Sequence, residues 1–88
     1  MIKKQIITSV ELKNKKIKNW PIWTCGISEF EWEYDDRESC YIIAGEGCII
    51  TEMEEVSFNP KDYIVFSKGL KCRWKVFKPV VKHYKFGK

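Results

Sequence analysis

Residues 29–34 read Glu-Phe-Glu-Trp-Glu-Tyr, so acidic and aromatic side chains alternate without a break. Because successive side chains of a β-strand point to opposite faces, Phe30, Trp32 and Tyr34 share one face and the glutamates share the other. The pattern predicts a half-buried strand whose aromatic side faces a core. Residues 70–77 repeat the alternation, with basic side chains at the outward positions.

The outward side chains of these two segments have opposite charge, since one carries glutamates and the other carries lysine and arginine. Opposite charges that face each other across paired strands stabilise the pairing. We therefore expect the two strands to be neighbours in one sheet. The outward residues concerned are Glu29, Glu31 and Glu33 on one strand and Lys71, Arg73 and Lys75 on the other.

The rest of the chain consists of short apolar segments separated by frequent turn signals. Further strands are expected at residues 39–44, 48–51, 56–58, 63–66 and 80–86. Gly45-Glu46-Gly47 is expected to form a hairpin turn, and Pro79 is expected to end the strand that begins at Leu70. Many short strands with almost no helix predict an all-β fold, either a sandwich or a jelly-roll barrel.

The N-terminal segment differs from the rest because it is polar and contains one helix signal. Thr8 and Glu11 have the spacing of a capping box, so a short helical turn is expected to begin near Ser9. We accordingly divide the chain into an N-terminal arm, residues 1–19, laid over a barrel domain, residues 20–88.

Length and composition indicate the number of domains, the kind of core and the cellular location to expect. At 88 residues the chain is expected to form one domain with a dense core, for which it supplies four Trp, four Tyr and five Phe. No apolar run approaches the roughly 20 residues of a membrane span, and no secretion signal is visible. We expect a cytoplasmic protein that does not associate with membranes.

The four cysteines could suggest disulfides or zinc, but neither interpretation is favoured. Reduced thiols are usual in the cytoplasm, and the chain has no C-x2-C pair. We expect Cys25, Cys40 and Cys48 to be small buried apolar residues.

Charge is segregated along the chain. Acidic residues concentrate between Glu29 and Asp62, whereas residues 68–88 contain basic residues and no acidic one. A basic tail could bind nucleic acid, but outward positions of an alternating strand explain the same charges, so nucleic-acid binding is not expected.

The aromatic strand also has the frame of a metal-binding motif. Cupins carry H-x-H-x3-E-x6-G, and at these positions the chain has Trp32, Tyr34, Glu38 and Gly45. The carboxylate and the glycine match, while both histidines are replaced.

The second cupin motif, G-D-x4-P-x-G-x2-H-x3-N, is also partly kept. Asp62 and Gly69 match it, and Cys72 stands at the position of its histidine. With these motifs and the aromatic residues between Trp20 and Phe86, the chain resembles small single-domain cupins. They belong to the cupin-3 group, are related to the cupin domains of (S)-ureidoglycine aminohydrolase, and have no settled reaction. The resemblance implies an RmlC-like jelly-roll barrel, or double-stranded β-helix.

The resemblance further implies that the motif residues converge inside the barrel. It places Trp32, Tyr34, Glu38 and Cys72 around one point. An indole nitrogen only donates hydrogen bonds, and a neutral phenol is a poor ligand. We expect no typical cupin metal and no other cofactor. The one alternative is a residual zinc site of Glu38, Cys72 and His83, which requires His83 to point inward. The competing interpretation is that Cys72 is a thiol packed in the core and that His83 is a core or surface histidine with its hydrogen bonds satisfied by other groups.

Two functions from different classes follow. The first is a binding module that takes a small polar molecule in an aromatic barrel mouth. Its expected ligand-binding residues are Trp32, Tyr34, Glu38, Cys40, Cys72 and Trp74. The second is a small enzyme with Glu38 as general acid or base, assisted by Tyr34 or His83, or with Cys72 as nucleophile. A carboxylate near Cys72 would raise the pKa of its thiol, so we prefer the binding module.

We also expect a homodimer. A chain this short with so many aromatic residues is not expected to cover all its apolar surface alone, and open sheet edges invite pairing.

Overall fold

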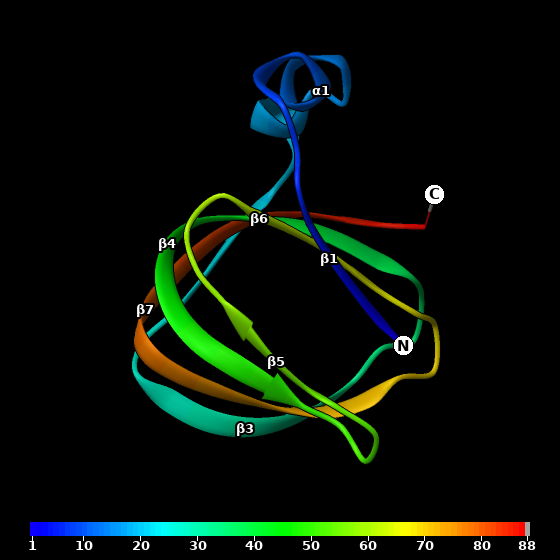
Figure 1. Ribbon diagram of the computed structural model, residues 1–88, viewed down its shortest axis with the longest axis vertical. Helices are drawn as coiled ribbons and strands as arrows, with labels where there is room; N and C mark the ends of the chain where they lie inside the picture. The colour runs from blue at the N-terminus through cyan, green and yellow to red at the C-terminus, as the bar shows by residue number, and fades with distance from the viewer. Residues whose placement is uncertain (88) are drawn as a thin grey trace.

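The computed structural model describes residues 1–87 and consists mainly of antiparallel strands that curl round a common core (Figure 1). Lys88, the last residue of the predicted barrel domain, lies outside the described residues. The elements are β1 (Ile2–Ile6), α1 (Ser9–Asn14), the 3-10 helix η1 (Ile17–Asn19), β2 (Ile22–Cys25), β3 (Ser28–Glu33), β4 (Glu38–Ile50), β5 (Glu55–Phe58), β6 (Asp62–Phe66) and β7 (Lys71–Phe86).

Two long strands, β4 and β7, hold the sheet together. The strand order is β1-β6-β4-β7-β2, with β3 also paired to β7 and β5 also paired to β4. Each long strand changes its second partner along its length, so β4 passes from β6 to β5 and β7 passes from β3 to β2. Strands that bend and change partner in this way make the corners of a closed fold. The predicted all-β class is confirmed, and the rolled sheet is consistent with a jelly-roll barrel.

The bend of β4 lies at two glycines. Gly45 has a φ of +103°, and a Cβ on it would lie 2.5 Å from the carbonyl oxygen of Pro79. A Cβ on Gly47 would overlap the carbonyl oxygen of Lys75 and lie 2.8 Å from the Phe58 ring. The predicted hairpin at residues 45–47 is therefore wrong. These glycines allow one continuous strand to bend tightly against β7.

Pro79 does not end its strand either, because β7 runs through it. The β4–β7 register shifts at this point, with Ala44 opposite Val81 and Glu46 opposite Lys78. On the other side of β7, β3 and β2 leave a gap of residues without partners. A proline lacks a backbone N–H, and here no ladder hydrogen bond requires one.

The N-terminal segment contains both an expected and an unexpected element. The capping box of α1 is confirmed, since the Thr8 side chain accepts from the Glu11 backbone and the Glu11 side chain accepts from the Thr8 backbone. Sequence reasoning missed β1, which pairs antiparallel with β6 from Ile2 opposite Phe66 to Ile6 opposite Asp62. In Figure 1, α1 stands away from the barrel, and β1 runs from the N-terminus along the barrel toward α1. The domain boundary at residue 20 stays a prediction.

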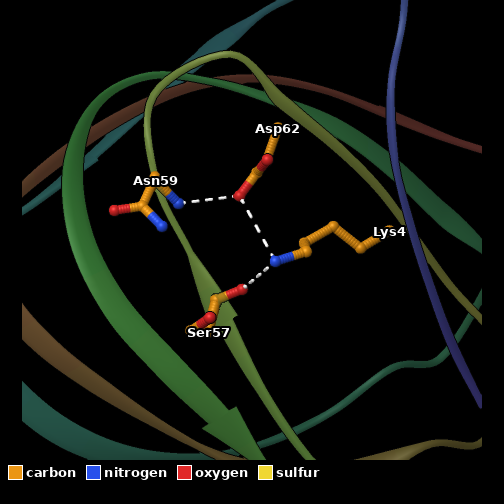
Figure 2. Close-up of polar contacts among 4 residues, drawn as sticks. All are labelled: Lys4, Ser57, Asn59 and Asp62. Carbon is orange, nitrogen blue, oxygen red and sulfur yellow. Dashed lines mark hydrogen bonds and ion pairs between the residues drawn. The ribbon is translucent and has the colours of Figure 1, made fainter.

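A polar cluster ties β1 to the turn between β5 and β6, as Figure 2 shows. The Lys4 Nζ donates to the Ser57 carbonyl oxygen over 2.9 Å and lies 3.8 Å from Asp62 Oδ2. The same Asp62 oxygen accepts a hydrogen bond from the Asn59 backbone over 2.8 Å. Asp62, the acidic residue of the second motif, thus fixes a turn and the neighbouring strand.

The predicted pairing of acidic and basic strands is confirmed. β3 and β7 are antiparallel neighbours, with Glu29 opposite Lys75, Glu31 opposite Arg73 and Glu33 opposite Lys71. Arg73 lies 2.8 Å from Glu29 and 3.6 Å from Glu31 in two ion pairs. All three side chains are well exposed, so each pair contributes under about 1 kcal/mol to stability.

Trp74 is the centre of the aromatic core and is only 2% exposed. Its ring is parallel to that of Phe30, at an interplanar angle of 5°, and contacts three further rings, those of Trp23, Phe58 and Phe66. Cys40 is fully buried, as expected. In residues 1–87, no helix combines the length and apolar character needed to cross a membrane.

Cys48 is also buried as expected, whereas Cys25 is only half-buried. The Cys25 sulfur lies 3.3 Å from the Ser28 hydroxyl at the turn between β2 and β3. Cys25 is therefore the last residue of β2, partly buried and packed against the core rather than enclosed in it.

Candidate ligand pocket

Inward side chains of β2, β3, β4 and β7 surround a cavity of about 200 Å³. The residues that line it are Trp23, Phe30, Trp32, Tyr34, Glu38, Trp74, Lys82, Tyr84 and Phe86. Seven of these nine side chains are aromatic, and the other two carry opposite charges. The cavity is thus an aromatic chamber with one charged pair in its wall.

The charged pair consists of Glu38 and Lys82. The Lys82 Nζ donates to Glu38 Oε2 over 2.7 Å, and the side chains are only 6% and 5% exposed respectively. The same ammonium lies 4.8 Å from the Trp23 ring centroid and 4.7 Å from that of Trp74. Both the carboxylate and the ring faces stabilise a cation removed from water.

The strands explain why these two residues meet. Glu38 begins β4 and Lys82 belongs to β7, and the two strands pair along most of their length. Alternate residues of a strand share a face, so Lys82 points inward together with Val80 and Tyr84. Glu38 likewise shares the inward face of β4 with Ile42, which lies opposite Lys82 in the ladder.

Tyr34 supplies a neutral hydroxyl to the same wall. Its ring stacks on Phe66 at 4.5 Å and 8°, and its hydroxyl accepts a hydrogen bond from the Trp74 indole over 3.2 Å. Burial, reinforced by the nearby charge of Glu38, raises the pKa of Tyr34 far above its usual value. Tyr34 therefore stays a phenol, whose O–H can still donate a hydrogen bond.

Trp32 lies at the rim of the cavity rather than deep inside it. Its side chain is half-exposed, and its ring meets that of Tyr34 edge-on at 6.4 Å. Trp32 also lines a second, more open hollow, whose other residues include Glu31, Lys71 and Cys72. The position expected for an enclosed motif residue is therefore partly open to solvent.

Cys72 and Cys40 lie outside the cavity lining, although both were expected to bind the ligand. Cys72 is 7% exposed and Cys40 is fully buried, and both pack within the hydrophobic core. Burial raises the pKa of Cys72 to about 11, with Lys82 acting against it and Glu38 adding to it. The pKa of Cys72 is raised as expected, but burial rather than the charge of Glu38 is the main cause. Burial likewise raises the pKa of Cys40 to about 12.

His83 faces away from the cavity. It follows Lys82 in the strand and so points to the opposite face, where its Nδ1 lies 2.9 Å from the Trp20 carbonyl oxygen. The expected zinc ligands Glu38, Cys72 and His83 are therefore not brought together. Within residues 1–87, no three His, Cys, Asp or Glu side chains form a group that could hold a metal ion.

The residues at the cupin metal positions also do not fit a metal by their chemistry. Trp32 has no lone pair to give, Tyr34 is held neutral, and Cys72 is a buried thiol. The remaining donor, Glu38, is already bound to an ammonium group. These four residues do not form a typical cupin metal site.

Sequence reasoning missed five of the residues that line the cavity, namely Trp23, Phe30, Lys82, Tyr84 and Phe86, and Lys82 is the one charged residue among these five. Lys82 belongs to the strand expected at residues 80–86, where it occupies an inward position between Val80 and Tyr84. A lysine among apolar inward residues requires a buried acceptor. Glu38, which the cupin motif places inside the barrel, is such an acceptor. An inward lysine and an inward glutamate in one small barrel are the signal from which this ion pair could have been predicted.

Comparison with known proteins gives the family. Residues 12–84 match the model of the EutQ-like cupin domain. A solved DUF861 family protein from Thermotoga maritima is 41% identical, with a TM-score of 0.96, covering 99% of this chain and 100% of that chain. No protein of curated function matches the sequence.

More distant structures share the fold. EutQ of Clostridium difficile is 20% identical with a TM-score of 0.67, and the match covers 94% of this chain and 64% of that chain. A putative EutQ of Salmonella typhimurium is 19% identical with a TM-score of 0.65, covering 72% of this chain and 51% of that chain. The predicted small cupin is confirmed: the chain belongs to the EutQ-like cupin domain family.

Proposed function

We propose that this protein binds a small polar molecule in its aromatic cavity and holds it through the Glu38–Lys82 ion pair, without a metal. One observation carries the proposal. The carboxylate at a cupin metal position binds the Lys82 ammonium over 2.7 Å, in the wall of the cavity. The positive charge that a metal supplies in other cupins is here covalently part of the chain.

The dimensions of the cavity limit the ligand. Its volume of about 200 Å³ lies below the ~300–1,000 Å³ of pockets for drug-sized molecules. Aromatic rings can stack on a flat ligand, while Tyr34 and Tyr84 provide hydroxyl groups. A compact molecule with a flat apolar part and one polar group fits this arrangement.

The ion pair itself supports a binding role better than a structural one. Replacing a buried ion pair by apolar residues of similar size is often neutral or stabilising, so stability alone does not explain the pair. Both Glu38 and Lys82 line the cavity. A polar pair at the wall of an otherwise aromatic chamber is typical of sites that orient a ligand.

The enzymatic alternative has less support. Glu38 is paired with Lys82, and the neutral states of Tyr34 and Cys72 disfavour a base or nucleophile there. The finer likeness to (S)-ureidoglycine aminohydrolase stays a proposal of kinship and carries no reaction over to this chain.

We also propose a cytoplasmic homodimer. The four cysteines are free, which suits a reducing compartment. The edge strand β1 is paired on one side with β6 and lies at the end of the strand order. An edge of this kind can pair with a second copy.

A thermal-shift screen of small polar molecules tests the binding function. The wild type should be stabilised by at least one compound, and the double variant Glu38→Leu/Lys82→Met should lose that response. A matched control is Glu29→Leu/Arg73→Met, which removes an exposed ion pair on the outer face and should respond like the wild type. Equal responses in all three proteins, or none in the wild type, would refute the proposal.

A further inference from the structure

We infer that the ligand of this cavity is an uncharged, planar molecule that presents a hydrogen-bond acceptor beside a donor, as an aromatic carboxamide does. The inference rests on the proposed binding function and adds the charge and polar pattern of the ligand. It follows from the Glu38–Lys82 pair and the rings around it.

The cavity wall already holds one positive and one negative charge. Glu38 and Lys82 neutralise each other within the wall, and their side chains are only 5% and 6% exposed. A charged ligand would bring a third charge into a largely aromatic space and leave it without a partner, which is costly. An anion would also meet the Glu38 carboxylate, and a cation would meet the Lys82 ammonium.

The aromatic walls do not change this balance in favour of a cation. Aromatic faces attract cations, but the faces of Trp23 and Trp74 already lie 4.8 Å and 4.7 Å from the Lys82 ammonium. A second cation would compete with Lys82 for the same rings. The cavity therefore disfavours both signs of charge.

Lys82 and Glu38 can each form further hydrogen bonds besides the one that joins them. An ammonium has three donors, and one N–H of Lys82 goes to Glu38. A carboxylate has several acceptor sites, so Glu38 can also accept a hydrogen bond from the ligand. The two polar atoms lie 2.7 Å apart, so adjacent atoms of one small group can reach both. A primary amide offers such an oxygen and nitrogen.

The aromatic rings that line the cavity favour a flat ligand. The rings of Phe30 and Trp74 are parallel within 5°, and further rings of Trp23 and Trp32 bound the same chamber. Flat molecules gain contact with such walls at little entropic cost, because few of their bonds rotate. An aromatic ring bearing the amide combines both requirements.

Isothermal titration calorimetry with benzamide, benzoate and benzamidine tests the inference at pH 7. The three molecules have nearly the same shape and carry no charge, a negative charge and a positive charge. Benzamide should bind at least about tenfold more tightly than either ion, because each ion brings a buried charge that the neutralised Glu38–Lys82 pair leaves without a partner. Tighter binding of benzoate or benzamidine, or no binding of benzamide, would overturn the inference.

A charge variant adds a second readout. Glu38→Gln leaves the Lys82 ammonium without its counter-charge, so the preference should move toward benzoate by about tenfold or more. Glu29→Gln removes an exposed carboxylate that lies outside the cavity and should keep the preference for benzamide. An unchanged preference in Glu38→Gln would contradict the charge argument. Should Glu38→Gln fail to fold, the wild-type series still decides.

The two proposals fail in different ways. If other small molecules stabilise the wild type while benzamide does not bind, the binding function stands and the ligand class is wrong. If no molecule binds the wild type, both proposals are wrong.

Discussion

Replacing Lys82 by methionine should destabilise the fold far more than the loss of a surface charge. Methionine approximates the lysine stem and keeps contact with the rings of Trp23 and Trp74, so the change mainly removes the ammonium. Glu38 is then left as a carboxylate with a side chain 5% exposed and without its counter-charge.

The expected loss follows from this burial. Removing one partner of a buried ion pair typically costs about 3–5 kcal/mol, because the remaining charge is neither hydrated nor paired. Domains of this kind have a total free energy of unfolding of about 5–15 kcal/mol. Lys82→Met should therefore remove a large share of the stability. The double variant Glu38→Leu/Lys82→Met should recover most of it, because no charge remains to be buried.

Urea unfolding followed by tryptophan fluorescence gives the free energies for a double-mutant cycle. Arg73→Met is the control, because Arg73 is 44% exposed in its side chain and its ion pairs lie on the surface. It should cost under about 1 kcal/mol. A loss below 1 kcal/mol in Lys82→Met, or a double variant less stable than Lys82→Met, would refute the reasoning.

Four further predictions concern other parts of the molecule. Cys72, in a variant that retains it as the only cysteine, should alkylate with an apparent pKa near 11 rather than 9. Since the folded state keeps this proton longer than the unfolded state, the contribution of Cys72 to stability is present below about pH 9 and lost toward pH 11. A pKa at or below 9 would revive the nucleophile. Gly45→Ala should cost several kcal/mol by thermal unfolding, because the Cβ would meet the Pro79 carbonyl oxygen at 2.5 Å, whereas Gly26→Ala meets nothing within 4 Å. Equal losses would contradict the close approach. Elemental analysis of protein purified without added metal should find no full equivalent of iron, manganese or nickel, and a full equivalent of iron would overturn the metal-free pocket. Light scattering at micromolar concentration should give a dimer mass, and a monomer mass would rule the dimer out.

Periodicity predicted much of the fold because it reports directly on which face of a strand is buried. The β3–β7 pairing followed from two opposite charge patterns, and the register matches residue for residue, with Glu31 opposite Arg73. Gly45 and Pro79 misled for a common reason. Glycine and proline mark turns in a short sequence window, but here they serve a bend between two long strands whose contact is non-local.

The pocket could be predicted only in part. The alternation of residues 70–77 places Trp74 inside, the cupin motif places Glu38 there, and both line the cavity. The cupin motif also places Cys72 there, and Cys40 is expected to bind the ligand, yet both are core residues, because a motif position or an alternating pattern identifies a face of a strand and not the depth along it. The partner of Glu38 lies 44 residues away in sequence, on another strand, and depends on the β4–β7 pairing.

The function proposed for this protein is the binding of a small molecule in the aromatic cavity beside the Glu38–Lys82 pair. Nuclear magnetic resonance of the indole N–H groups tests this directly in a titration with the tightest compound from the screen. Trp23 and Trp74 line the cavity, whereas Trp20 packs near Tyr63 outside it and serves as the internal control. We predict that the Trp23 and Trp74 signals shift with a common affinity while the Trp20 signal stays in place. A titration that shifts Trp20 and leaves Trp23 and Trp74 unchanged would contradict this prediction.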